Sequence, residues 1–358
     1  MRKTRVGLIY GGLSSEHEVS IQSARNVYEA LRPEKYEVTL IWIDRTGQWF
    51  VIDSALHLEG TSTEPVGAPL TFSPMLRGGR SVRIENGSDT VHIDVAFPVL
   101  HGQNGEDGRV QGFLQTVGIP YVGADVLGSA VCMDKEVTKR LLRDAGLPIT
   151  PFLVLYGSDE SALSFSEIES RFGTPFFVKP ANSGSSVGIT KVDNAEKFKL
   201  AIEHAFGYDK KILIEKGIAG REIECAVLGN EKPEASVVGE VISTDEFYTY
   251  DAKYIDADAS WMEVPAEVPE RVSDKIRELA KRACRVLGCE GMARVDFFLA
   301  DDGEIMINEV NTIPGFTLRS MYPLMWEKTN LPNDQLVDRL IELALERHKR
   351  DSRISTSR

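Results

Sequence analysis

The residues of this chain best suited to chemistry are two carboxylates, an amide and a guanidinium within residues 294–315: Arg294, Asp296, Glu309 and Asn311. Carboxylate and amide oxygens are ligands that Mg²⁺ prefers, and this cation usually completes its coordination with water and substrate phosphates. The alternative interpretation is the solvated polar face of an amphipathic hairpin. Because the stretch is otherwise apolar and ends in Asn-Thr-Ile-Pro-Gly, we favour a cation and phosphate site.

A hairpin is expected to position these residues. Two apolar runs, 292–299 and 304–311, flank Asp301-Asp302-Gly303, which is typical of a tight turn. Side chains alternate between the two faces of a strand. One face is therefore predicted to carry Arg294, Asp296 and Phe298 from the first strand, and Ile305, Ile307, Glu309 and Asn311 from the second.

Composition describes an ordinary globular protein with two or three domains. The chain has 358 residues, of which 42% are hydrophobic and 27% charged. With 41 basic against 54 acidic residues, its net charge is −13, which argues against nucleic acid or an anionic membrane as a partner. The four cysteines show no CxxC pair and no nearby histidine, as expected for reduced core residues. No apolar run approaches the ~20 residues that span a bilayer, so a soluble, cytoplasmic protein is expected.

The N-terminal part has an α/β pattern. An apolar strand, Val6–Tyr10, precedes a helix that is predicted to reach Leu31 and to start with a capping box formed by Ser15 and Glu18. A strand at Glu37–Asp44 completes a βαβ unit. Residues 45–90, rich in Gly, Ser, Thr and Pro, are predicted to be an irregular insertion.

Further elements follow along the chain. A buried strand at 93–100 leads into a loop with four glycines, and a helix is predicted over 109–118. Later helices are expected at 133–145 and 270–287, and later strands at 176–179, 212–216, 221–229 and 235–242. Residues 243–263 form a polar loop, and 347–358 a frayed basic tail.

The chain contains neither a Walker-type phosphate loop nor the dinucleotide fingerprint. The small residues of 183–188 would let backbone N–H groups approach an anion closely, although such loops are often plain connectors. Lys179, at the end of the preceding strand, either extends into solvent or holds a phosphate. Glu215 and Glu222 either bind a nucleotide or lie on the surface.

Two interpretations are open for the two acids at the start of the first helix. One of Glu16 and Glu18 is explained by the helix dipole, and the other carboxylate could bind a substrate ammonium. His101, which follows a buried strand, would orient a catalytic loop, although a lone histidine is more often structural. Tyr254 lies in a stretch too polar for a core and too aromatic for a linker, which indicates an active-site lid.

Together these motifs resemble the D-alanine–D-alanine ligases of the ATP-grasp superfamily, and the resemblance covers nearly the whole chain in order. The segments that carry it are G-G-L-S-S-E-H-E-V-S (11–20), H-G-Q-N-G-E-D-G (101–108), M-D-K (133–135), V-K-P-A-N-S-G-S-S-V-G (178–188), Y-D-A-K-Y (250–254), R-V-D-F (294–297) and N-E-V-N-T-I-P-G-F-T (308–317).

The resemblance implies an α/β fold, α+β in part, with ATP-grasp architecture and an N-terminal Rossmann-like preATP-grasp domain. It divides the chain into residues 1–122, 123–219 and 220–358, with a lid near 243–262. It also implies that ATP phosphorylates the carboxylate of one D-alanine and that the amine of a second D-alanine attacks the acyl phosphate. The product would serve peptidoglycan synthesis.

Matched residue by residue, the family pattern assigns five positions to the amino-acid substrates. Glu16 would bind the ammonium of the first D-alanine, while Ser185 and Tyr254 would link the first helix to the lid. His101 would belong to the substrate site, and Ser320 would hold the carboxylate of the second D-alanine.

The same pattern assigns the ATP site. Lys135, Lys179 and Ser186 would contact the phosphates, and Lys253 would reach the γ-phosphate from the lid. The adenine and ribose contacts would come from Glu215, Glu222, Phe298 and Ile307, of which the last two would sandwich the base.

The hairpin would serve both half-reactions. Asp296, Glu309 and Asn311 would bind two Mg²⁺ or Mn²⁺ ions for phosphoryl transfer. Arg294 and the backbone N–H of Gly315 would stabilise the oxyanion of the tetrahedral intermediate. Because the acyl phosphate would hydrolyse in water, a closing lid is a chemical requirement.

Some alternatives stay open. Ile313 and Phe316 resemble longer family members and the related ligases of vancomycin resistance, so D-serine or D-lactate is an alternative second substrate. Tyr254 favours D-alanine over D-lactate, because relatives that use D-lactate typically lack this tyrosine. A regulator that binds ATP without chemistry is a third possibility, disfavoured by the full set of metal ligands. Family members are commonly dimers, so a homodimer is expected.

Overall fold

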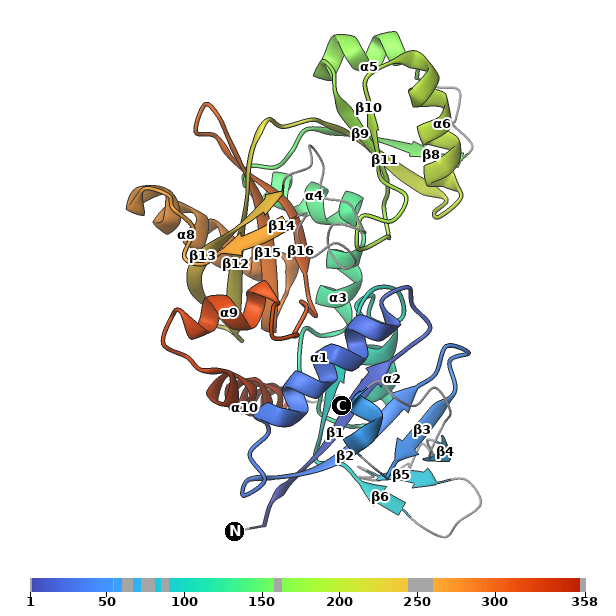
Figure 1. Ribbon diagram of the computed structural model, residues 1–358, viewed down its shortest axis with the longest axis vertical. Helices are drawn as coiled ribbons and strands as arrows, with labels where there is room; N and C mark the ends of the chain where they lie inside the picture. The colour runs from blue at the N-terminus through green and yellow to red at the C-terminus, as the bar shows by residue number, and fades with distance from the viewer. Residues whose placement is uncertain are drawn as a thin grey trace.

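The computed structural model describes residues 2–53, 55–59, 67–71, 81–84, 90–157, 163–243 and 260–354. Three β-sheets follow one another along the chain, and along the long axis of the molecule the third sheet lies between the first and the second (Figure 1). No helix of the described ranges is long and apolar enough to cross a membrane.

The first sheet has the strand order β6-β5-β4-β3-β2-β1-β7. Its core strands are β1 (Thr4–Gly11), β2 (Tyr36–Ile43) and β7 (Val95–Val99), and β1 pairs in parallel with both neighbours. Helix α1 (His17–Ala30) connects β1 to β2, which confirms the predicted βαβ unit. The loop after β7 leads into α2 (Arg109–Thr116).

The prediction of an irregular insertion over residues 45–90 is wrong. This region contributes β3 (Trp49–Ile52), the short helix η1 (Ala55–Glu59), β4 (Gly67–Thr71), β5 (Ser81–Ile84) and β6 (Thr90–His92). These strands extend the sheet antiparallel from β2. Without β3, β2 would present an unpaired edge. Composition concealed the strands, because β-propensity depends strongly on the neighbours that a strand finds in the fold.

The second sheet, β10-β9-β11-β8, is small and antiparallel. It consists of β8 (Phe152–Tyr156), β9 (Phe176–Pro180), β10 (Thr190–Val192) and β11 (Lys211–Lys216). Helices α5 (Phe165–Phe172) and α6 (Ala195–Phe206) cover it, and their apolar sides join the strands in one core around Phe176 and Ile168.

The third sheet, β14-β13-β12-β15-β16, is entirely antiparallel. Its strands are β12 (Gly220–Gly229), β13 (Glu234–Ser243), β14 (Ser260–Glu263), β15 (Gly291–Ala300) and β16 (Ile305–Asn311). On one face, Ile223 and Cys225 pack with α8 (Glu270–Leu287), a helix predicted with these bounds. On the other, Ala226 and Leu228 pack with α9 (Met321–Glu327) and α10 (Asn333–Asp351).

Two helices connect the first sheet to the second along the chain where one was predicted, and the second of them lies between the second and third sheets (Figure 1). They are α3 (Val126–Met133) and α4 (Lys135–Asp144). Asp134 interrupts them in an extended conformation and caps α4, because its carboxylate accepts hydrogen bonds from the N–H groups of Glu136 and Val137 at 3.1 Å each. The division of the chain after residues 122 and 219 remains a prediction, although β11 ends and β12 begins on either side of the second boundary.

The prediction of a frayed tail from Arg347 is also wrong. Helix α10 continues to Asp351, and Arg347 is only 5% exposed. Its guanidinium lies 4.7 Å from the centre of the Tyr121 ring, and it donates to the carbonyl oxygens of Tyr121, at 2.9 Å, and Gly123. Helix α10, which packs on the third sheet, is therefore anchored to the segment that follows the first sheet.

Replacing Arg347 by methionine should lower the free energy of unfolding by about 2–4 kcal/mol, because two buried carbonyl groups lose their donors. Urea titration followed by fluorescence measures this change. Arg339→Met is the matched control on the same helix. Arg339 is 41% exposed and, within the described part of the chain, pairs with two surface glutamates, so its loss should cost less than about 1 kcal/mol. Equal effects of the two substitutions would contradict the anchoring role.

Candidate active site

A cavity of about 560 Å³ lies where the three sheets approach one another. Its walls come from the start of α1, the loops after β7 and β9, strands β12, β15 and β16, and the segment before α9. Among the predicted site residues that the structure describes, all but Ile307 line it: Glu16, His101, Lys135, Lys179, Ser185, Ser186, Glu215, Glu222, Arg294, Asp296, Phe298, Glu309, Asn311, Gly315 and Ser320. Lys253 and Tyr254, with most of the predicted lid, fall outside the described residues.

The hairpin of β15 and β16 brings its polar residues together as predicted. Arg294 lies opposite Asn311, and Asp296 lies opposite Glu309. The guanidinium of Arg294 donates twice to Asp296, at 2.7 Å from both Nε and Nη2, and the Asn311 amide donates to the same carboxylate at 2.9 Å. Burial alone would lower the pKa of Arg294, but the charges of Asp296 and Glu224 outweigh it and raise the pKa well above its usual value.

The predicted face of β16 is wrong for the residues that precede Glu309, because a β-bulge interrupts the register. Phe297 pairs with Ile307, so Asn308 is an extra residue on β16. Ile307 is fully buried in the core against α8, and its N–H donates to the carbonyl of Pro148 at 2.9 Å. It does not line the cavity.

Asn308 takes the place on the cavity wall that alternation gave to Ile307. Among the described residues, its buried side-chain oxygen has no hydrogen-bond partner, which is costly unless a ligand or water donates to it. The sequence reasoning missed Asn308. An asparagine in an otherwise apolar run was the only signal available.

The donor set suits Mg²⁺ held jointly with phosphates. Within the described residues, His, Cys, Asp and Glu side chains form no group of three or more able to hold a metal by themselves. Asp296, Glu309 and Asn311 instead offer two carboxylates and one amide oxygen, the partial set from which Mg²⁺ is completed by substrate oxygens. The Glu309 carboxylate also lies 3.3 Å from the ammonium of Lys135, so this charge is already balanced without a metal.

A buried cluster of three charges lies beside the cavity. The carboxylate of Glu215, 2% exposed, lies 2.7 Å from the ammonium of Lys179 and 3.3 Å from that of Lys139. Burial would raise the pKa of Glu215, but the two lysine charges outweigh it and lower the pKa. Burial lowers the pKa of Lys139 to about 8. The sequence reasoning missed Lys139, which lies one helical turn beyond Lys135 on the same side of α4.

Glu16 lies at the N-cap of α1, yet its side chain does not cap the helix. It accepts a hydrogen bond from the Ser185 hydroxyl of the loop after β9. A side chain at Gly102 would lie 2.8 Å from the Glu16 carboxylate, and the φ of +75° at this position also favours glycine. The predicted capping box of Ser15 and Glu18 is wrong, because the helix starts at His17 and its N-cap residue is Glu16.

His101 fixes the segment that carries Gly315. It is 4% exposed, and its ring nitrogens lie 2.9 Å from the Ser23 hydroxyl and 3.1 Å from the carbonyl of Ile313. Burial would lower its pKa, but the hydrogen bond with Glu106 and the charges of Glu16 and Glu106 outweigh it and raise the pKa.

Ser320 lies close beside Gly315. A Cβ atom at Gly315 would lie 2.9 Å from the Ser320 hydroxyl oxygen, which accepts from the N–H of Thr317 at 2.9 Å. The backbone of Gly315 and the hydroxyl of Ser320 therefore lie side by side on the cavity wall.

Two family profiles match nearly the whole chain. The profile described as D-ala D-ala ligase N-terminus matches residues 5–124, and the one described as D-ala D-ala ligase C-terminus matches residues 141–342. Among curated proteins, D-alanine–D-alanine ligase A of Salmonella typhimurium is 49% identical over 100% of both chains. The D-alanine–D-alanine ligase of Oceanobacillus iheyensis is 46% identical over 99% of each.

Solved structures agree. The D-alanine–D-alanine ligase from Coxiella burnetii superimposes with a TM-score of 0.89 at 37% identity, covering 99% of this chain and 97% of that chain. The VanG D-Ala:D-Ser ligase of Enterococcus faecalis superimposes with a TM-score of 0.86, also at 37% identity, covering 96% and 100%.

Lys139 should make stability depend on pH in the alkaline range. Its pKa falls from a usual 10.5 to about 8 on folding, so between these values the unfolded chain holds more protons than the folded one. Stability contributed by this group therefore rises with pH across that window. The difference in free energy of unfolding, wild type minus Lys139→Met, should increase by about 3 kcal/mol from pH 8 to pH 10.5, measured by urea titration. Curves that stay parallel across the window would contradict the shifted pKa.

Proposed function

Because the chain belongs to the D-alanine–D-alanine ligase family, we propose that it joins two D-alanines into D-alanyl-D-alanine while ATP is converted to ADP and phosphate. Membership also confirms the predicted fold class, an α/β chain with an N-terminal preATP-grasp domain and antiparallel ATP-grasp sheets. The dipeptide serves peptidoglycan synthesis. One observation carries the assignment of the active site: the opposed pairs Arg294–Asn311 and Asp296–Glu309 line a cavity that also contains Lys135 and Lys179.

The first half-reaction transfers a phosphoryl group. A carboxylate oxygen of the first D-alanine attacks the γ-phosphorus of ATP, the bond to the β–γ bridging oxygen breaks, and ADP leaves. Lys135 and Lys179 bind and neutralise the phosphates in this proposal, because both ammonium groups lie on the cavity wall beside carboxylates that already orient them. Mg²⁺ held by Asp296, Glu309 and Asn311 would supply further charge neutralisation.

The nucleoside is proposed to lie between the second and third sheets. Glu215 and Glu222 would accept from the adenine amino group and the ribose, and Phe298 would pack against the base. Asn308 replaces Ile307 as a candidate contact of the base, because Asn308 and not Ile307 lines the cavity. Ser186 remains a candidate phosphate contact.

The second half-reaction forms the amide. The neutral amine of the second D-alanine attacks the acyl carbon, the carbon–oxygen bond to phosphate breaks, and the amine loses a proton. Arg294 and the N–H of Gly315 would face the oxyanion of the tetrahedral intermediate, where one donor is worth about 3 kcal/mol. Glu16 would bind the first ammonium, since a carboxylate only 7% exposed favours a cation beside it. Ser320 would bind the second carboxylate.

The second substrate is open to one alternative. The similarity to a D-Ala:D-Ser ligase is nearly as close in structure as that to the D-alanine–D-alanine ligase from Coxiella burnetii. Tyr254, which relatives that use D-lactate typically lack, lies outside the described residues. The homodimer and the lid remain predictions.

An acceptor panel tests the proposed reaction. Phosphate release with ATP and D-alanine alone should be sustained, and adding D-serine or D-lactate should produce little mixed product by mass spectrometry. Turnover that requires D-serine would replace the proposal by a D-alanine–D-serine ligase. Negligible turnover with D-alanine would refute it.

Glu309→Gln should lower the rate of ligation by at least about 100-fold, because one carboxylate ligand of the proposed Mg²⁺ site is lost. Circular dichroism should show an unchanged fold. Glu304→Gln, an exposed position on the same hairpin, is the matched control and should retain full activity. Near-normal turnover of Glu309→Gln would exclude the metal assignment.

A further inference from the structure

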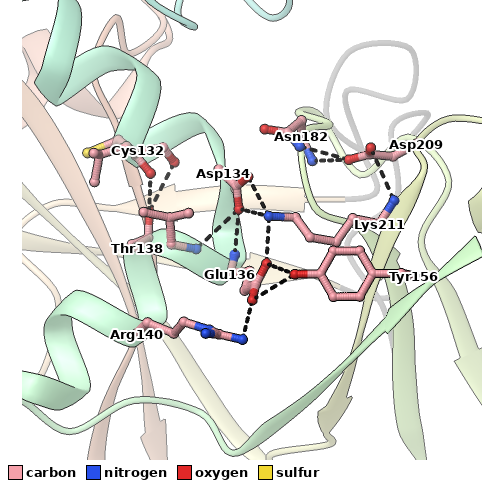
Figure 2. A network of polar contacts seen from close by, with 11 residues as sticks. Cys132, Asp134, Glu136, Thr138, Arg140, Tyr156, Asn182, Asp209 and Lys211 are labelled. Carbon is pink, nitrogen blue, oxygen red and sulfur yellow. Dashed lines mark hydrogen bonds and ion pairs between the residues drawn. The ribbon is translucent and has the colours of Figure 1, made fainter. Parts of the chain in front are cut away.

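Lys135, a proposed phosphate ligand, is flanked in sequence by two acids that both contact a lysine of the second sheet (Figure 2). The ammonium of Lys211 lies 2.8 and 2.6 Å from the carboxylate oxygens of Asp134, and 2.6 Å from that of Glu136. Burial would lower the pKa of Lys211, but these two carboxylates outweigh it and raise the pKa. All four side chains are at least half-buried, so screening by water is weak.

Backbone hydrogen bonds complete a ring around Lys135. The N–H of Lys135 donates to the carbonyl of Ala181 at 2.9 Å, and the N–H of Ala181 donates to the carbonyl of Lys211 at 3.0 Å. Beyond Ala181, Asn182 donates twice to Asp209, two residues before Lys211 (Figure 2). The start of α4 is thus connected to the end of β9, after which the loop of residues 183–188 follows, and to the start of β11.

The two acids differ in their other partners. Glu136 also pairs with Arg140 at 2.5 Å and accepts from the Tyr156 hydroxyl at 3.3 Å (Figure 2). Within the described residues, Asp134 pairs with no cation other than Lys211, and its carboxylate otherwise accepts only from backbone N–H groups of α4. Removing the charge of Lys211 would therefore leave Asp134 as an under-compensated carboxylate beside Lys135.

Such a carboxylate competes for the nearest mobile cation. The Lys135 ammonium, on a flexible four-carbon chain, now lies 3.3 Å from Glu309 and donates to the carbonyl of Ser183 at 2.6 Å, both at the cavity. A second anion adjacent to it in sequence would draw it away from that position.

We infer that Lys211 is a positioning residue for nucleotide binding: by neutralising Asp134 and Glu136, it leaves Lys135 directed at the nucleotide phosphates. This inference rests on the proposed function, which assigns Lys135 to those phosphates. It extends the site to a residue that does not itself line the cavity.

Binding measurements with ligands that differ only in their phosphates test the inference. Calorimetry should show that Lys211→Met weakens ADP binding about tenfold, whereas adenosine binding stays within about twofold of wild type. Lys210→Met, the exposed neighbouring lysine, is the matched control and should bind ADP as the wild type does. If Lys211→Met does not fold, Lys211→Gln takes its place.

A rescue variant separates positioning from simple attachment of β11 to α4. In Lys211→Met combined with Asp134→Asn, the asparagine still caps α4 but no longer attracts Lys135. ADP affinity should return to within about threefold of wild type. A double variant as weak as the single one, or an equal loss for ADP and adenosine, would overturn the inference and leave a structural ion pair.

The outcome for the wild type distinguishes the two proposals. Wild-type protein that binds neither ADP nor ATP would refute the proposed function itself. Wild-type protein that binds ADP, together with a Lys211→Met variant of unchanged ADP affinity, would refute only the role of Lys211.

Discussion

The structure around the cavity depends on one electrostatic constraint: a charge that leaves water must find an opposite charge. Around α4 these partners come from different sheets. Lys139 pairs with Glu215 of β11, Lys135 with Glu309 of β16, and Asp134 with Lys211 of β11. Helix α4 belongs to neither sheet, and these ion pairs link it both to the second sheet and to the third. They therefore help to hold the walls of the cavity at a defined separation.

The same pairing prepares the cavity for a polyanion. Before any ligand binds, the proposed phosphate-binding lysines are balanced by Glu215 and Glu309. Nucleotide phosphates and a divalent cation would enter as a second matched set, so the ammonium of Lys135 would turn to phosphate while the metal binds Glu309. Preorganised charges of this kind lose little energy to reorganisation during reaction. Arg294, already held by two hydrogen bonds from its guanidinium to Asp296, illustrates the principle at the proposed oxyanion site.

A single β-bulge decides which residues of β16 take part. It places Glu309 and Asn311 on the cavity side together with Asn308, and turns Ile307 into the core against α8. Bulges of this type redirect side chains beside active sites because one extra residue shifts the alternation. As a result, the short strand β16 contributes polar residues to the cavity wall and apolar residues to the core.

Local sequence was enough for the hairpin, for helix α8, for the βαβ unit and for the family, because turn signals, periodicity and ordered motifs are encoded by residues close together in the chain. Of the site residues that it predicted and that the structure describes, all but Ile307 line the cavity. The tertiary structure alone decided that Asn308 rather than Ile307 faces the cavity, that residues 45–90 extend a sheet, and that Arg347 is an anchor. It alone revealed Lys139 and Lys211, since a lysine in a helix or strand shows nothing of the carboxylate that it will meet. Strand register and buried ion pairs join residues far apart in sequence, and only the folded chain brings them within the few ångströms over which these interactions act.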